Sequence, residues 1–180
     1  MKTLITVPST ELVVSTQLAK QHLRLDADDG SDDELIKHLI EVATERAEHE
    51  LGRSLLTKTY QVLVAHIGVI SLIPNLVNII SVVYIDCDGI ETTLTSDDYI
   101  FSDAWPVPKI YPKRTNENRI KITYTAGYGN ADAIPKAIKQ WVLVDLATLY
   151  ENREAVMNYG VNSVPYAFVD GLLDAYRVQY

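Results

Sequence analysis

Four side chains that could bind a metal ion share one face of a predicted helix: His38, Glu41, Glu45 and His49. The i, i+4 spacing of Glu45 and His49 would place a carboxylate beside an imidazole. Di-iron bundles need a Glu three residues before each ligating His, and those positions here hold Leu35 and Arg46. The His-Glu-x-x-His pattern is also missing. A solvated polar face explains these residues equally well, and we expect no metal ligands.

Three other patterns resemble reactive or ligand-binding sites, but each lacks a required part. The acidic stretch Asp26–Asp33 places Ser31 and Lys37 where a calcium-binding EF-hand loop needs its glycine and its glutamate. Gly127-Tyr128-Gly129 follows a predicted strand but lacks the third glycine and the lysine of a phosphate loop. Cys87 lies at a predicted hairpin turn with no histidine near it in the sequence. We therefore expect no catalytic residues and no cofactor.

Two helices are predicted in the first third of the chain. Ser15 can cap a short helix that runs to about Leu23. Ser31 and Glu34 form a capping box for a second helix, whose apolar residues recur at helical spacing. Gly52 is well placed to end that helix.

From about residue 60 to residue 125 the apolar pattern changes to a period of two. Gln61–Val64 and Val77–Ile85 are rich in β-branched residues, and Ile120–Tyr124 alternates apolar and polar side chains. Asp88-Gly89 lies between two such runs, which indicates a tight hairpin turn. These segments predict an antiparallel sheet.

The last third of the chain is predicted to be helical again. Pro135 suits the first turn of a helix whose apolar side chains form a wide stripe. Asp145 lies within that stripe, so its carboxylate needs a partner or a path to water. Pro165 opens a predicted final helix.

The sequence therefore predicts an α+β fold in a single domain, residues 1–180. A helical core of about four helices is expected at 15–57 and 133–178, with a small antiparallel β-sheet inserted at about 58–126.

Composition limits the classes of function. The chain has 180 residues, 16 Lys and Arg against 24 Asp and Glu, and a formal net charge of −8. A dedicated nucleic-acid binder is disfavoured because phosphate neutralisation needs a basic surface. The lone cysteine cannot form an internal disulfide, which suits a reducing compartment. The residues before Pro8 are too few for a signal-peptide core, and polar residues interrupt Val62–Ile80, so we expect no signal peptide and no membrane span.

Charge is segregated along the chain. Residues 26–50 hold ten acidic residues against two basic ones, and residues 109–121 hold five basic residues against one acidic one. Two solvated surfaces would explain this pattern. We hypothesise instead that copies of the chain meet acidic helix to basic loop, in a head-to-tail contact that closes into a ring. The candidate subunit-interface residues are Asp32, Asp33, Glu41, Glu45, Lys109, Lys113, Arg114 and Arg119.

Seven short segments follow one another in a characteristic order: Leu18–Arg24, Leu51–Leu56, Asp86–Gly89, Thr125–Gly129, Ile134–Ile138, Tyr150–Glu154 and Leu172–Arg177. In this order and spacing the chain resembles the head–tail connector (adaptor) proteins of tailed bacteriophages, almost from end to end. Its long, tyrosine-rich β insert is absent from the shorter, all-helical members, so the resemblance carries over no detailed ring geometry.

The resemblance implies a structural protein of the virion neck, at the head–tail junction, which would be present in the host cytoplasm during assembly. It implies a ring, dodecameric in the particle, that docks on the phage portal protein and extends the DNA channel. The ring would also offer a platform to a tail or stopper protein. DNA would pass through without specific binding, no membrane would be contacted, and no catalytic residues are implied.

We further expect the C-terminal segment to become ordered on the portal, with these candidate contact residues: Arg177, Val178, Gln179 and Tyr180. Two alternatives stay open at this point. One is a different neck or tail-completion protein. The other, which we favour less, is a small metal-dependent enzyme using His38, Glu45 and His49.

Overall fold

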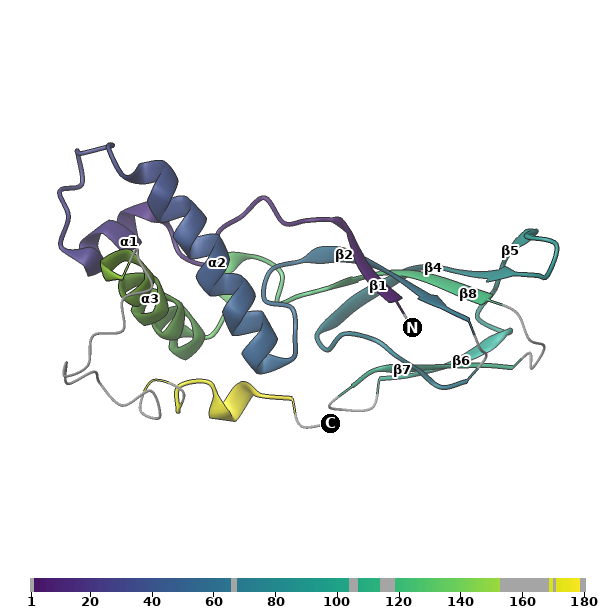
Figure 1. Ribbon diagram of the computed structural model, residues 1–180. Helices are drawn as coiled ribbons and strands as arrows, with labels where there is room; N and C mark the ends of the chain where they lie inside the picture. The colour runs from purple at the N-terminus through teal and green to yellow at the C-terminus, as the bar shows by residue number, and fades with distance from the viewer. Residues whose placement is uncertain are drawn as a thin grey trace. The chain divides into compact units, whose positions relative to one another are not determined.

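The regular structure of the chain falls into two units, one helical and one made of sheets (Figure 1). The computed structural model describes residues 2–65, 68–103, 107–113, 119–152, 169 and 171–178. The sheet unit comprises Met1–Ser9, Thr57–Tyr128 and Val178–Tyr180, and the helical unit comprises Thr10–Leu56 and Gly129–Arg177. The single domain expected from the sequence stays a prediction.

The described residues of the helical unit form three α-helices: α1 (Thr16–Leu23), α2 (Asp33–Leu51) and α3 (Lys136–Glu151). The predicted start of the first helix and the predicted end of the second helix are confirmed. Ser15 Oγ accepts a hydrogen bond from the Leu18 N–H at 3.2 Å, and Gly52 ends α2 at a φ of +66°. Pro135 directly precedes α3, as the sequence predicts.

The start of α2 differs from the predicted capping box. Asp32 is its N-cap residue, and the Asp32 side chain makes no capping hydrogen bond. The Ser31 N–H donates to the Asp29 carboxylate at 2.9 Å, so this residue belongs to the acidic loop rather than to the helix cap.

Apolar side chains from α2 and α3 form the core of the helical unit, and α1 packs against both helices. The fully buried large side chains of this core include Ile36, Ile40, Leu51, Ile138, Trp141 and Leu146. Their i, i+3 and i+4 spacing is the stripe that the sequence predicts for both helices.

The sheet unit consists of two antiparallel sheets (Figure 1). The five-stranded sheet has the order β1-β2-β8-β4-β5, and the three-stranded sheet has the order β3-β7-β6. The strands are β1 (Lys2–Val7), β2 (Lys58–Val64), β3 (Ile70–Ser71), β4 (Leu76–Ile85), β5 (Glu91–Thr93), β6 (Tyr99–Ser102), β7 (Lys109–Pro112) and β8 (Arg119–Ala126).

Alternate side chains of β2, β4, β7 and β8 fill the core of the sheet unit. Tyr60 and Tyr124 lie opposite each other on β2 and β8, and their rings stack with centroids 5.6 Å apart. The Tyr124 hydroxyl oxygen accepts a hydrogen bond from the Ile73 N–H at 3.2 Å, so a fully buried tyrosine keeps a polar partner.

The predicted hairpin turn joins β4 to β5. The Asp86 carboxylate accepts hydrogen bonds from the Asp88 and Ile90 N–H groups, at 3.0 and 2.8 Å. Gly89 has a φ of +83°, which a side chain would disfavour. Gly127 and Gly129 likewise have positive φ values in the predicted strand-to-helix turn.

The predicted fold class is wrong because it overstates the helices and understates the strands. The described residues hold three α-helices rather than about four, and eight strands in two sheets rather than one small sheet. β1 lies outside the predicted insert, and every residue of this edge strand is exposed, so no buried alternation marks it in the sequence. The first part of the predicted final helix, residues 165–168 and 170, falls outside the described residues. Its closing part is a short 3₁₀ turn at Asp174–Tyr176.

Asp145 of α3 has the partner that its place in the apolar stripe requires. Its Oδ1 lies 2.7 Å from a terminal nitrogen of Arg46 on α2, and the two side chains are 3% and 43% exposed, respectively. Burial raises the pKa of the Asp145 carboxyl above its usual range, and the Arg46 charge opposes that rise. The ion pair therefore offsets part of the cost of burying a carboxylate between two helices.

We expect Arg46→Met to lower the free energy of unfolding by about 1–3 kcal/mol at pH 7, because it leaves a buried carboxylate without its counter-charge. Adding Asp145→Leu should recover most of that loss, because the stranded charge is then gone. Urea unfolding of the two single variants and the double variant measures the effect. Equal stability of Arg46→Met and wild type would contradict it.

The pH dependence has a definite sign. Because the pKa of Asp145 is raised in the folded state, the folded protein binds a proton at a higher pH than the unfolded chain does. Wild type should therefore gain stability relative to Asp145→Asn as the pH falls through that raised pKa toward 3.8.

Candidate functional site

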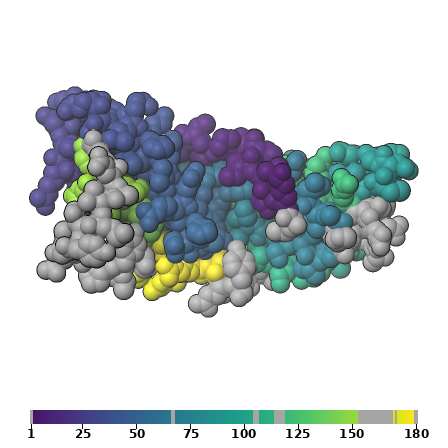
Figure 2. All heavy atoms as spheres, in the orientation of Figure 1, coloured from purple at the N-terminus to yellow at the C-terminus, as the bar shows by residue number. Residues whose placement is uncertain are grey.

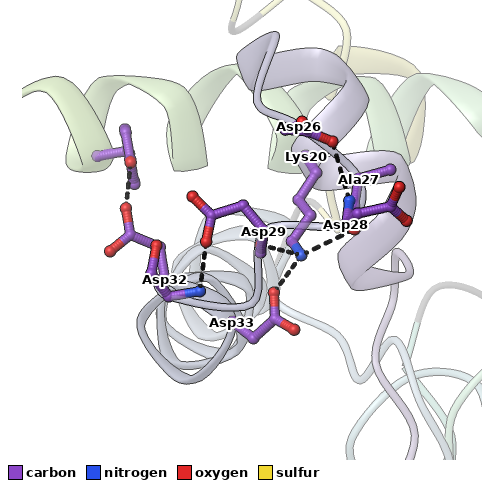
Figure 3. Close-up of polar contacts among 9 residues, drawn as sticks. Lys20, Asp26, Ala27, Asp28, Asp29, Asp32 and Asp33 are labelled. Atoms are coloured by element: carbon purple, nitrogen blue, oxygen red, sulfur yellow. Dashed lines mark hydrogen bonds and ion pairs between the residues drawn. The ribbon is translucent and has the colours of Figure 1, made fainter.

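The acidic loop between α1 and α2 folds around one buried ammonium group (Figure 3). Lys20 is 5% exposed, although it is a lysine on a short surface helix. Its Nζ donates hydrogen bonds to the carbonyl oxygens of Asp29, at 2.7 Å, and Ala27, at 3.3 Å. It also forms an ion pair with the Asp33 carboxylate at the first residue of α2. Lys20 thus joins α1, the loop and α2.

Side-chain to backbone hydrogen bonds fix the remainder of the loop (Figure 3). The Asp26 carboxylate accepts from the Asp28 N–H at 3.0 Å, and the Asp29 carboxylate accepts from the Ser31 N–H at 2.9 Å. The hydrogen bonds from Ser31 lower the pKa of the Asp29 carboxyl below its usual range. The Asp29 carboxyl is therefore ionised at neutral pH, and these hydrogen bonds hold the loop backbone in place.

The four acidic interface candidates separate into two pairs. Asp32 accepts a hydrogen bond from the Tyr150 hydroxyl of α3, and Asp33 pairs with Lys20, so both have intramolecular roles. Glu41 and Glu45 are exposed one turn apart on α2. The Asp33 side chain is also 48% exposed, but its carboxylate is already paired with Lys20, whereas Glu41 and Glu45 are exposed on the helix surface.

The basic candidates lie in the sheet unit. Lys109 is half-buried in β7, and Arg119 is exposed at the start of β8. Lys113 is exposed, and its Nζ donates to the Asp97 carbonyl oxygen at 2.7 Å. Arg114 lies outside the described residues.

The candidate portal residues are only partly described. Arg177 is half-buried and forms ion pairs with Asp174 at 3.2 Å and with Glu50 of α2 at 3.5 Å. Val178 is half-buried, whereas Gln179 and Tyr180 lie outside the described residues.

The metal hypothesis gains no support from the geometry. Glu45 and His49 line a surface hollow of about 270 Å³ together with Val42, Arg46 and Glu50, and His38 is exposed. Within the described part of the chain, no three His, Cys, Asp or Glu side chains are grouped as metal ligands would be. Cys87 is exposed at the hairpin. No described helix is long and apolar enough to cross a membrane.

Sequence reasoning missed Lys20 as an organising residue. A lysine in the last turn of a helix, directly before an acid-rich loop, would have been the signal. The sequence does not indicate that Lys20 is buried, and its burial is what marks it as an organising residue.

Residues 16–86 match the family model described as phage gp6-like head-tail connector protein. This segment runs from α1 to the end of β4, and the predicted resemblance to head–tail connectors is confirmed there. A search of curated proteins found no match.

Three solved structures resemble the whole chain. One, the neck of an empty GTA particle computed with C6 symmetry, has a TM-score of 0.84 at 20% identity and covers 100% of this chain and 97% of its own. A chain from the virion of a native gene transfer agent (GTA) particle has a TM-score of 0.82 at 20% identity, and the match covers 100% of this chain and 97% of that chain. A chain from the neck of a native GTA particle computed with C12 symmetry has a TM-score of 0.66 at 19% identity, and the match covers 98% of this chain and 96% of that chain. At this identity, the likeness establishes the fold.

We expect Lys20→Met to lower the free energy of unfolding by about 1.5–3 kcal/mol, because two carbonyl oxygens and the Asp33 carboxylate lose a charged donor. The matched control is Lys136→Met at an exposed position of α3, which should change stability by less than about 0.5 kcal/mol. Urea unfolding measures both variants. Hydrogen exchange should show faster opening of the acidic loop in Lys20→Met, and equal effects of the two substitutions would contradict the role of Lys20.

Proposed function

We propose, from the match of residues 16–86 to the phage head-tail connector family, that the chain is a structural connector that forms a ring in the neck of a tailed particle. The ring would seat on the portal protein, extend the DNA channel and offer a platform to a tail or stopper protein. The family match carries this proposal. The C6 and C12 symmetries of the similar GTA neck structures support a closed ring of many copies, and we propose a dodecamer.

The electrostatics suit a channel that DNA crosses without being held. The net charge of −8 includes the acidic loop between α1 and α2. Negative charge repels phosphate, so a ring of such subunits favours sliding over binding. No membrane contact, metal or cofactor is part of the proposal, and the role of every named residue is structural.

The charge-segregated surfaces provide the proposed ring contact. Glu41 and Glu45 would face Lys113, Arg114 and neighbouring basic residues of the next copy. One surface is acidic and the other is basic. The acidic surface of each copy can therefore contact the basic surface of the next copy, which is the arrangement of a head-to-tail ring. The place of synthesis before assembly is, in this proposal, the host cytoplasm, and the final place is the virion neck.

Capture with the tagged full-length chain from a lysate of its source phage should retain the portal protein. A chain ending at Arg177 should retain less of it, because the segment proposed to order on the portal is removed. Mass spectrometry of the retained proteins measures both results. Capture of a tail protein without the portal would favour a tail-completion role, and equal portal recovery by the two chains would remove the C-terminal contact.

Reversing charge in the basic loop, with Lys113→Glu and Arg114→Glu, should weaken ring formation most strongly at low salt, where the attraction is least screened. Adding Glu41→Lys and Glu45→Lys should restore assembly, because the pairing is then reversed on both sides. The matched control is Lys136→Glu with Lys139→Glu, the same change of charge on α3. Analytical ultracentrifugation and electron microscopy of assembled necks measure ring content. Unchanged assembly of the basic-loop variant at low salt would contradict the contact.

A further inference from the structure

The edge strand β1 presents apolar side chains to solvent. All six of its residues are exposed, and Leu4 and Ile5 are 47% and 53% exposed. β1 pairs with β2 on one side and ends the five-stranded sheet on the other. In the space-filling view its purple atoms lie on the surface (Figure 2). An edge of this kind is a template for pairing with another strand.

A second edge in the same unit has the same character. β6 ends the three-stranded sheet, and its Ile100 and Phe101 are 56% and 40% exposed. The other two sheet edges in the described residues are weaker templates. β5 has three residues with no large apolar side chain, and β3 has two residues. Only β1 and β6, among the described edge strands, combine at least four residues with exposed apolar side chains.

The two edges match in length and in charge. The pairing of β1 with β2 is regular over Lys2–Ile5 and shifts at a bulge after Ile5, and β6 is four residues long. Aligned antiparallel, Leu4 lies opposite Phe101 and Ile5 lies opposite Ile100. The same register places Lys2 opposite the exposed Asp103, directly after β6. Opposed apolar pairs and an opposite-charge pair are the combinations that stabilise neighbouring strands.

We propose that β1 of one copy pairs antiparallel with β6 of the next copy in this register. The partner is a second copy because one chain carries both complementary edges, and no described strand pairs with the outer side of either. Such a contact is heterologous, so it propagates from copy to copy and forms a ring when the rotation between neighbouring copies closes. The inference rests on the proposed ring and supplies it with a backbone-to-backbone contact between subunits.

Cysteine cross-linking tests this register in assembled particles. In a Cys87→Ser background, Ile5→Cys and Ile100→Cys are combined in one chain, which places the two thiols directly opposite each other between copies. Directly opposed Cβ atoms are about 4.5–5.5 Å apart, close enough for a disulfide after small shifts. The matched control combines Leu4→Cys with Ile100→Cys, whose side chains point to opposite faces of the sheet. Mild oxidation of purified particles and non-reducing gels give the readout.

The proposal expects a ladder of covalent oligomers from the first combination and monomer from the control. Particles that contain the protein but give no ladder would overturn the strand pairing and leave the connector function intact. Covalent dimers from Ile5→Cys alone would also overturn it, because they indicate pairing of β1 with itself. Absence of the wild-type chain from particles would refute the connector function, and the inference with it.

A second pair of variants does not depend on disulfide geometry. Ile5→Asp with Ile100→Asp places like charges opposite each other, and incorporation into particles should be lost. Ile5→Lys with Ile100→Asp places opposite charges there, and incorporation should return. Both positions are exposed, and circular dichroism verifies that each variant is folded. Equal incorporation of the two variants, whether high or low, would overturn the proposal.

Discussion

The crowding of negative charge between residues 26 and 50 is the constraint around which the helical unit is built, and the buried ammonium group of Lys20 offsets it where the loop turns. The loop is fixed to α1, and α2 begins at Asp33, where the carboxylates of Asp33 and Glu34 interact favourably with the positive end of the helix dipole. The Tyr150 hydroxyl joins the same end of α2 to α3. The carboxylates left over, on the exposed side of α2, are those available to a partner.

The two units are stabilised by different interactions. In the helical unit, the apolar stripe is interrupted by Asp145, and an arginine from the facing helix compensates its charge. In the sheet unit, the core consists of aliphatic side chains, Tyr84 and the stacked pair Tyr60 and Tyr124. A change of pH therefore acts on the Asp145–Arg46 pair of the first unit, whereas loss of core volume would act on either unit.

Local signals predicted the elements that they control directly. Ser15, Gly52 and the Asp88-Gly89 turn were identified correctly because caps and turns depend on a few adjacent residues. The strand β1 and the burial of Lys20 were missed because both depend on contacts far along the chain or across a loop. Of the candidate site, the sequence indicated which segments are charged. It could not indicate that Asp32 and Asp33 have partners within the same chain, Tyr150 and Lys20, respectively.

The pairing of β1 with β2 has a consequence for synthesis on the ribosome. β1 is complete at Val7, but its partner begins at Lys58, and the whole of α1 and α2 is made in between. At translation rates of about 5–20 residues per second, that interval lasts on the order of several seconds. During it, α1 and α2 can form from local contacts, whereas β1 has no neighbour. β1, the edge strand of the finished sheet, is therefore synthesised well before β2, the strand with which it pairs.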